Sequence, residues 1–279
     1  MDSAHTRFRL SLLGHFELQD VSGPITLPSG KLCGLLAFLA CTPRGCSRDY
    51  LMTLLWGSHF QAQARQNLRQ SLTRLRRILG QGAFDGNGEV VRLRPGLVSC
   101  DVEKFEVSIY LPTRDALMEA ARVYRGPFLE GLVIAGEEWT DWLTLQRQNL
   151  ENQALDLLIR VAELQIRSGD MKEAMVSALR AIAINNFRED AHRIAMRAIA
   201  ATGNKALALK HYNKLCHDLR QELNVEPSAG TQAVAAELRQ GRISVSLAEL
   251  TSFARKRFNP RPRADVDWHP PCYLPKWHE

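Results

Sequence analysis

The chain has 279 residues, 45% of them hydrophobic, and a formal net charge of +6 that divides into +5 over residues 1–101, −2 over 102–241 and +3 over 242–279. This length and composition predict a globular protein with room for about two domains, and they argue against a mainly disordered chain. The longest apolar run, residues 32–41, is too short to cross a bilayer and no signal segment is evident, so we expect a cytoplasmic protein without membrane contact.

Short strands are predicted near the N-terminus, where residues 8–18 and 25–27 are apolar with polar breaks. From residue 31 the apolar residues fall on one helical face, and Pro43 ends this first helix. A second helix is predicted over residues 48–56, between a serine that can cap its N-terminus and a glycine that can end it.

The stretch ARQNLRQSLTRLRRILG, residues 64–80, carries five arginines, and no Asp or Glu occurs anywhere from residue 50 to residue 84. On a helical wheel four leucines form one stripe, which we predict to be core: Leu68, Leu72, Leu75 and Leu79. The opposite face and its margins are polar and consist of Gln63, Gln66, Asn67, Arg69, Gln70, Thr73, Arg74, Arg76 and Arg77.

Amide and guanidinium groups can form paired hydrogen bonds with base edges in a major groove, and arginines beside them can neutralise phosphates. We therefore interpret this face as a DNA-binding surface, with Arg74 and Arg77 near the bases and Arg69 and Arg76 near phosphates. Arg65, close to the leucine stripe, is expected to brace the fold. The alternative is an ordinary solvated helix face. Such a face would normally place Glu one turn away from Arg, and none occurs here.

After a glycine-rich loop, residues 81–88, two alternating segments flank a Pro-Gly pair and predict a hairpin of residues 90–94 with residues 97–102. Arg92 and Arg94 share one strand face, where they form a wing that can lie along DNA. Taken alone, two exposed arginines would be equally compatible with an ordinary surface. The order of strands, three helices and hairpin matches a winged helix-turn-helix.

The composition from residue 102 to residue 241 is helical, and the predicted helices cover residues 115–124, 137–167, 171–185, 189–202, 205–223 and 228–240. Gly169 and Gly203 lie 34 residues apart, and each is followed five residues later by alanine, Ala174 and Ala208. This period is typical of tetratricopeptide repeats, in which glycine forms the turn and alanine permits close helix packing. An irregular helical bundle is the alternative.

Four aromatic residues at the start of this part could line a ligand pocket, but their helical spacing favours a core position: Tyr124, Phe128, Trp139 and Trp142. The segment 242–279 is rich in Pro and basic residues, and we expect a solvated tail rather than a nucleic-acid-binding arm.

No catalytic or cofactor signature is present, so an enzyme is not expected and no cofactor is predicted. The sequence SGKL, residues 29–32, lacks the first glycine and the final hydroxyl of a phosphate-binding loop. The six cysteines form no C-x-x-C pair and lack zinc-ligand spacing, which predicts reduced thiols and no metal site.

An ordered set of segments resembles the antibiotic-regulatory-protein type of bacterial activator. It comprises LPSGKLCGLLAFLA (27–40), DYLMTLLW (49–56), QARQNLRQSLTRLRRILG (63–80), DVEKFE (101–106), YRGPFLEGL (124–132), EEWTDWLTLQR (137–147) and EPSAGTQAVAAEL (226–238). The resemblance implies a mainly α protein. An OmpR/PhoB-like winged helix-turn-helix over residues 1–101 would be followed by a tetratricopeptide-like bacterial transcriptional activator domain over residues 102–241 and the tail over 242–279.

The resemblance further implies an activator that binds double-stranded promoter DNA as a homodimer on direct repeats and recruits RNA polymerase. Within LTRLRR (72–77), it places Arg74 at bases and Arg76 at phosphate, and it gives Arg94 the position of the wing arginine. Two alternatives remain open at this point. One is a protein-interaction scaffold whose winged helix contacts proteins, and the other is a fragment of a nucleotide-dependent switch.

Overall fold

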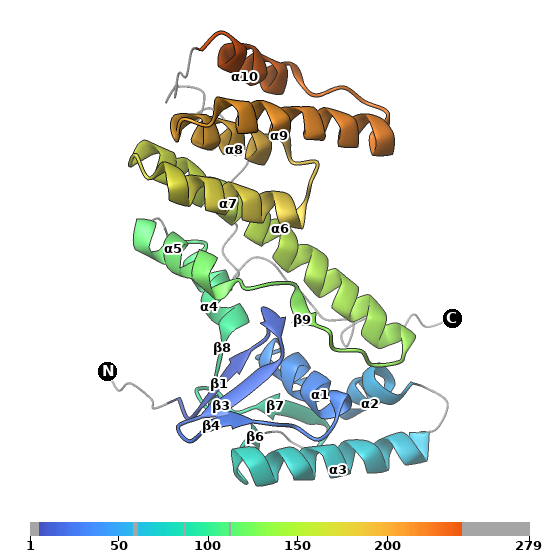
Figure 1. The fold of residues 1–279 in the computed structure, drawn as a ribbon. Coiled ribbons are helices and arrows are strands. Elements are labelled where there is room, and N and C mark those ends of the chain that lie inside the picture. Colours follow the sequence, from blue (N-terminus) through green and yellow to red (C-terminus); the bar gives the residue numbers. More distant parts are fainter. Residues whose placement is uncertain (1–5, 58–60, 86–87, 112, 242–279) are drawn as a thin grey trace. The chain divides into compact units, whose positions relative to one another are not determined.

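The structure is a computed structural model that describes residues 6–57, 61–85, 88–111 and 113–241 (Figure 1). The chain forms two compact units. The N-terminal unit contains the described residues up to Val107 together with Val123–Leu150, and the helical unit contains Ser108–Arg122 and the described residues from Glu151 onwards. The domain boundary after residue 101 stays a prediction, and the predicted tail lies outside the described residues.

The larger sheet of the N-terminal unit has four strands in the order β4 (Gly23–Ile25), β3 (Glu17–Asp20), β1 (Phe8–Ser11), β8 (Val98–Cys100). Neighbouring strands are antiparallel except for β1 and β8, which run parallel. Along β1 the side chains of Phe8 and Leu10 are buried whereas that of Arg9 is exposed, as expected for a sheet with one face on the core. The short strands predicted within residues 8–18 are confirmed. The strand predicted at 25–27 lies two residues earlier.

Three helices follow the sequence prediction closely: α1 (Gly30–Ala40), α2 (Arg48–Trp56) and α3 (Gln61–Leu79). The Ser47 hydroxyl accepts a hydrogen bond from the backbone N–H of Tyr50, which satisfies one of the free donors at the start of α2. Gly57 ends α2 with a φ of 76°, a value that favours glycine over residues with a side chain. The predicted cap and the predicted end of α2 are therefore confirmed.

The predicted hairpin of residues 90–94 with 97–102 is wrong. The first of these segments forms β7 (Val90–Leu93), which pairs with β6 (Phe84–Asp85) on one side and with β5 (Cys46–Ser47) on the other. The second forms β8, which joins the four-stranded sheet beside β1. An alternating pattern shows which residues share a face of a strand but does not identify the strand that pairs with it. The partner strand β6 lies in a glycine-rich segment, where no strand was predicted.

The strand that was predicted to extend to residue 102 ends at Cys100. Asp101 begins a helix, α4 (Asp101–Ser108), which was not predicted from the sequence. The Asp101 carboxylate accepts hydrogen bonds from the backbone N–H groups of Leu12 (2.8 Å) and Leu13 (3.0 Å). These bonds tie the start of α4 to the segment after β1. That segment leads into a second small sheet, formed by β2 (Gly14–His15) and β9 (Phe128–Glu130).

An aromatic cluster completes the core of the N-terminal unit. Trp142 lies at a ring-centroid distance of 5.1 Å from Phe38 on α1, 5.7 Å from Phe128 and 4.9 Å from Trp139. All four side chains are buried, and so is Tyr124, which confirms that the predicted aromatic group is core. Both tryptophans come from the first half of α6 (Glu137–Arg167), so Val123–Leu150 packs with the winged helix rather than apart from it.

In the helical unit, α6 to α9 are antiparallel helices joined by short turns (Figure 1). After α5 (Arg114–Val123) and the second half of α6 come α7 (Met171–Ile184), α8 (Glu189–Ala201), α9 (Lys205–Asp218) with a π-helical turn η1 (Leu219–Leu223), and α10 (Ala229–Arg239). Each predicted helix agrees with these bounds to within a residue or two, apart from the turn that ends α9. Within the described part of the chain, no helix combines the length and apolar character needed to cross a membrane.

The predicted 34-residue repeat corresponds to two equivalent turns. Gly169, before α7, and Gly203, before α9, have φ values of 82° and 90°, which side-chain-bearing residues rarely adopt. Ala174 on α7 and Ala208 on α9 are both fully buried. Because corresponding residues occupy corresponding places in the two copies, the structure confirms the tetratricopeptide-like arrangement over an irregular bundle.

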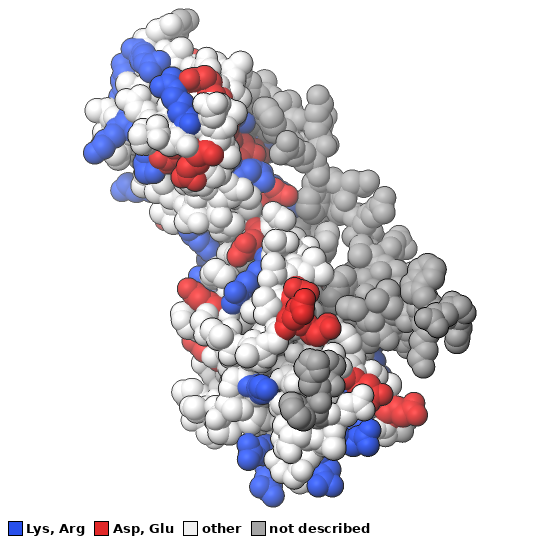
Figure 2. Space-filling model, turned by 90° about the vertical axis from the view of Figure 1, so that its right-hand side faces the viewer, with Lys and Arg blue, Asp and Glu red and all other residues white. Residues whose placement is uncertain are grey.

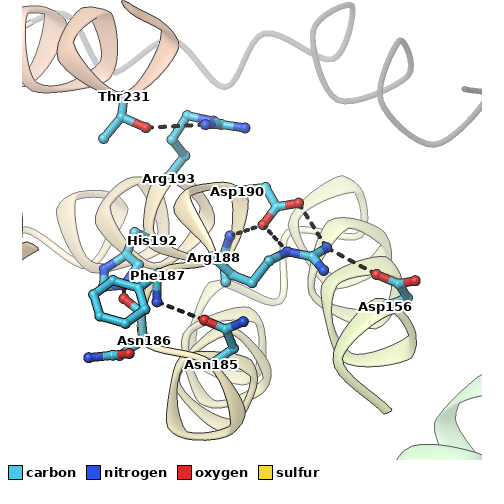
Figure 3. A network of polar contacts seen from close by, with 10 residues as sticks. Asp156, Asn185, Asn186, Phe187, Arg188, Asp190, His192, Arg193 and Thr231 are labelled. Carbon is cyan, nitrogen blue, oxygen red and sulfur yellow. Dashed lines mark hydrogen bonds and ion pairs between the residues drawn. The ribbon is translucent and has the colours of Figure 1, made fainter. Parts of the chain in front are cut away.

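Polar contacts tie α6, α8 and α10 together (Figure 3). The Arg188 guanidinium, just before α8, forms ion pairs with Asp156 on α6 (3.0 Å) and with Asp190 (3.1 Å). Arg193 on α8 donates to the hydroxyl of Thr231 on α10 (3.1 Å). Arg188 and Arg193 therefore have partners that offset the cost of removing their charge from water.

Two neutral histidines link α8 to α9. The Nε2 atom of His192 lies 2.8 Å from the carbonyl oxygen of Asn186, which can only accept, so Nε2 carries the proton. The Nδ1 atom of His192 then accepts from Nε2 of His211 at 2.9 Å. Burial lowers the pKa of both rings, and for His211 burial together with the neighbouring His192 lowers the pKa to about 4.

Gly34 provides a test of the packing of α1 against Ile134 and the start of α6. A Cβ atom at this position would lie 2.5 Å from Ile134 and 2.9 Å from Trp139, distances that require the core to shift. We expect Gly34→Ala to lower the free energy of unfolding by about 1–3 kcal/mol, measured by urea denaturation followed by tryptophan fluorescence. Gly30→Ala, in the same helix but with ordinary van der Waals distances, is the control and should change stability by less than about 1 kcal/mol. Equal effects of the two substitutions would contradict the packing argument.

The histidine pair predicts a dependence of stability on pH. Because the folded-state pKa of His211 is depressed, the unfolded chain binds a proton between about pH 6.5 and about pH 4 that the folded chain does not. The contribution of neutral His211 to the free energy of unfolding should therefore be fully present above pH 6.5 and decrease as the pH falls through this window. The expected decrease is roughly 1–2 kcal/mol after allowance for partial solvent exposure. In urea titrations at several pH values, His211→Asn should lose much of this decrease. Parallel curves for the wild type and the variant would contradict the assignment.

Glu163 on α6 should have the opposite pH dependence. Burial raises its pKa to about 7, so the folded chain retains a proton that the unfolded chain releases above about pH 4.5. The contribution of protonated Glu163 to the free energy of unfolding is fully present below pH 4.5 and is lost as the pH rises through about 7. We expect Glu163→Gln to be more stable than the wild type at pH 8. Between pH 4.5 and pH 8, the difference in free energy of unfolding between the two proteins should change in favour of the variant by on the order of 1–2 kcal/mol. A stability difference independent of pH would show that Glu163 is ionised in the folded protein.

Candidate nucleic-acid interface

The two faces of α3 differ as the helical wheel predicts. Leu68, Leu72, Leu75 and Leu79 are each no more than 1% exposed, and with them α3 packs on α2 and α1. The exposed side chains on the other face are Gln63, Gln66, Arg69, Gln70, Thr73, Arg74 and Arg77. Asn67 and Arg76 are half-buried at its margins. The predicted leucine stripe is thus confirmed, and most of the candidate residues do reach the surface.

Hydrogen bonds formed within α3 determine which donor and acceptor groups of this face remain available to a ligand. The Gln63 amide donates to the side-chain oxygen of Asn67 at 3.1 Å, which leaves the Asn67 amide nitrogen as a donor. The Thr73 hydroxyl donates to the carbonyl oxygen of Arg69 at 2.9 Å. Thr73 therefore presents its methyl group and an accepting oxygen, the groups suited to a thymine methyl or to a donating base edge.

The arginines of α3 carry charge that is not neutralised locally. In the described part of the chain, Arg65, Arg69, Arg74 and Arg77 form no ion pair with Asp or Glu, which agrees with the absence of acids from residue 50 to residue 84. The side chain of Arg65 is exposed and makes no hydrogen bond or ion pair with a described residue, so the expectation that it braces the fold is wrong. Its side chain extends the cationic surface towards the N-terminal end of α3.

Figure 2 shows Lys and Arg side chains along the lowest part of the N-terminal unit, the level at which α3 lies in Figure 1. A surface of this kind attracts a polyanion, and long side chains on one helix face fit the dimensions of a major groove. The chemistry available is hydrogen-bond donation and charge neutralisation. Such groups support binding rather than bond cleavage.

The wing is formed by β6 and β7, with Phe84 opposite Leu93 and Asp85 opposite Arg92. Arg92 and Arg94 are both exposed, as predicted, but their surroundings differ. Arg92 lies 3.7 Å from the Asp85 carboxylate, which neutralises part of its charge, whereas no ion pair between Arg94 and a described acid is formed. Arg94 is therefore the stronger candidate for a contact with an anionic ligand.

Two arginines outside the exposed face contact the wing itself. The guanidinium carbon of Arg76 lies 5.7 Å from the centre of the Phe84 ring, although the sequence analysis assigned Arg76 to phosphate. Arg48, at the start of α2, donates through its side chain to the carbonyl oxygen of Gly88, and its backbone N–H donates to that of Glu89 at 2.8 Å. Sequence reasoning missed Arg48, since its distance of 40 residues from Gly88 leaves no local signal.

Comparisons with known proteins agree with this architecture. The model of the family described as bacterial transcriptional activator domain matches residues 111–239. Regulatory protein AfsR of Streptomyces coelicolor is 27% identical over 230 residues, which are 78% of this chain and 22% of AfsR. Transcriptional regulatory protein MoaR1 of Mycobacterium tuberculosis is 23% identical over 244 residues, which are 81% of this chain and 77% of MoaR1.

Among solved structures, Mycobacterium tuberculosis EmbR in complex with a low-affinity phosphopeptide has a similar fold, with a TM-score of 0.69 and 19% identity. The match covers 89% of this chain and 69% of the EmbR chain. The present chain thus corresponds to about a fifth of AfsR and to most of MoaR1.

Proposed function

We propose that this chain, which carries a bacterial transcriptional activator domain and is related to the regulators AfsR and MoaR1, is itself a sequence-specific DNA-binding regulator of transcription. The observation that carries the proposal is the outer face of α3. It is exposed, free of acids and composed of amides and arginines, and it lies on a helix whose other face is anchored by four leucines. The earlier resemblance to the antibiotic-regulatory-protein family is confirmed by these relatives.

In this function α3 enters the major groove. Gln66 and Gln70 are suited to adenine, because a side-chain amide can both donate to and accept from its edge. Arg74 and Arg77 are suited to guanine, which presents two acceptors side by side. Arg69, at the margin of the face, neutralises a phosphate, and each such contact releases counterions and steepens the dependence of affinity on salt.

The wing provides a second contact next to the first. Arg94, the residue directly after β7, is exposed and bears an unneutralised charge, so it can bind the DNA backbone or the negative potential of a narrow minor groove. Asn67 and Arg92, at the borders of the two surfaces, complete the proposed interface. Together the two elements would define both the base sequence and the orientation of the protein on the duplex.

The helical unit would couple binding to transcription. We propose that the protein acts in the cytoplasm as an activator, binds direct repeats near a promoter as a homodimer and recruits RNA polymerase through its helical unit. The relatives support regulation of transcription as the general function. Repeat spacing, dimer formation and the polymerase contact are the finer parts of the proposal, and chromatin immunoprecipitation with a promoter reporter would measure them together.

Arg74 and Arg69 give the sharpest test of base reading against phosphate binding. We expect Arg74→Ala to lose about 1–3 kcal/mol of binding free energy on the preferred site and to relax preference at one base position, because a paired contact to a base is removed. Arg69→Ala should instead weaken binding to all sequences alike and lower the magnitude of the slope of log K against log salt by about one. Gel-shift titrations on selected and scrambled DNA at several salt concentrations provide both quantities.

A matched control is Arg122→Ala, which removes the same charge from an exposed position on α5 and should leave binding unchanged. If the purified protein binds no DNA even at low salt, or if Arg74→Ala and Arg69→Ala both bind like the wild type, α3 is not the reading helix. The protein-interaction scaffold would then be the better description.

A further inference from the structure

The contact between Arg76 and Phe84 joins the end of α3 to the start of the wing. Arg76 lies in the last turn of α3, and its backbone carbonyl accepts from the N–H of Gly80, where the helix ends with a φ of 106°. Its guanidinium lies over the ring of Phe84, the first residue of β6. One residue therefore closes the helix through its backbone and contacts the wing through its side chain.

The burial of both partners distinguishes this contact from an incidental surface contact. Phe84 is 9% exposed, and Arg76 is half-buried whereas its neighbours Arg74 and Arg77 are exposed. A guanidinium over an aromatic face is attracted by the negative potential of the ring, and the attraction increases as water is excluded. Arg76 therefore has a partner within the protein that competes with any phosphate.

Phe84 in turn determines the position of the wing arginines. It pairs with Leu93 across the β6–β7 ladder, and the backbone N–H of Arg94 donates to the carbonyl oxygen of Ala83 at 2.9 Å. Arg92 lies opposite Asp85 in the same ladder. A displacement of Phe84 would disturb these pairs, which position both arginines.

The far side of the wing is held by a second set of contacts. Arg48 bonds to the carbonyl oxygens of Gly88 and Glu89, and β5 pairs with β7. A Cβ atom on Gly45 would lie 2.8 Å from the Cβ atom of Arg92, so the wing packs closely against the segment before α2. With one side held by these contacts, the Arg76–Phe84 contact fixes the side next to α3.

From this geometry we infer that Arg76 is a positioning residue, which holds the wing at a fixed offset from the reading face of α3 and so presents Arg94 to the DNA. This inference rests on the proposed function for its binding consequences, but the positioning itself is a property of the free protein. It replaces the phosphate contact that the sequence analysis assigned to Arg76. It also gives Phe84, which carries no charge, a role in electrostatic binding.

The first experiment needs no DNA. Amide hydrogen exchange of the free full-length protein should show faster exchange in residues 90–94 for Phe84→Leu and for Arg76→Gln than for the wild type, with exchange in α3 unchanged. Phe8→Leu is the matched control, since Phe8 is also buried beneath an arginine, Arg7 at 5.2 Å, but lies on β1. The control should leave exchange in residues 90–94 as it is in the wild type. Unchanged exchange in both wing variants would overturn the inference.

The second experiment measures binding. Phe84→Leu removes no cation, yet it should lower the magnitude of the slope of log K against log salt by about one, because the Arg94 contact is lost. Arg94→Ala should then have little further effect in the Phe84→Leu background, whereas it should lower the slope in the wild type and in Phe8→Leu. If Arg76→Ala lowers the slope while Phe84→Leu keeps the wild-type value, Arg76 contacts phosphate directly and the inference fails. A wild-type protein that does not bind DNA would refute the proposed function, and the exchange result would still decide the positioning.

Discussion

The burial of Leu68, Leu72, Leu75 and Leu79 fixes the rotation of α3 about its own axis. Side chains on a helix keep fixed angles to one another, so anchoring this stripe also determines which side chains face outward. The amides and arginines of the outer face gain their common direction from the leucines beneath them. A rotation by one residue, about 100°, would bury polar groups that have no partners in the core and expose leucine in their place. The core thus orients the candidate site through the geometry of the helix.

Most of the helices could be predicted because their signals are local, whereas α4, which directly follows β8, was missed. The caps at Ser47 and Gly57, the leucine spacing in α3 and the turns at Gly169 and Gly203 each involve residues within a few positions of one another. The wing could not be predicted in the same way. Its strand β6 has only two residues, and its partner β7 had an equally plausible neighbour in the segment that forms β8. The pairing of strands depends on packing between segments that are distant in the sequence, so it cannot be inferred from a single sequence.

The residues of the candidate site likewise divide into those that could be predicted from the sequence and those that could not. A helical wheel is sufficient to place Arg74, Arg77 and Gln70 at the surface, because only the helix itself matters. The wheel also places Arg76 at the margin, but the nearby position of Phe84 depends on how the chain returns after Gly80. The contact of Arg48 with Gly88 spans 40 residues and depends on the β5–β7 pairing. The surface residues of the site are thus accessible to sequence reasoning, whereas the residues that orient the wing are not.

Between residues 50 and 84 no Asp or Glu is present to neutralise the arginines of α3 when the protein has no ligand. Five guanidinium groups on one 19-residue helix repel one another, and pairs such as Arg65 with Arg69, one turn apart, each cost a few tenths of a kcal/mol. Dissolved salt screens this repulsion, so rising ionic strength should favour the folded N-terminal unit while it weakens attachment to a polyanion. Stability and attachment therefore respond to salt in opposite directions. The helix carries a charge pattern that is unfavourable in isolation and becomes favourable only when an external anion supplies the missing negative charge.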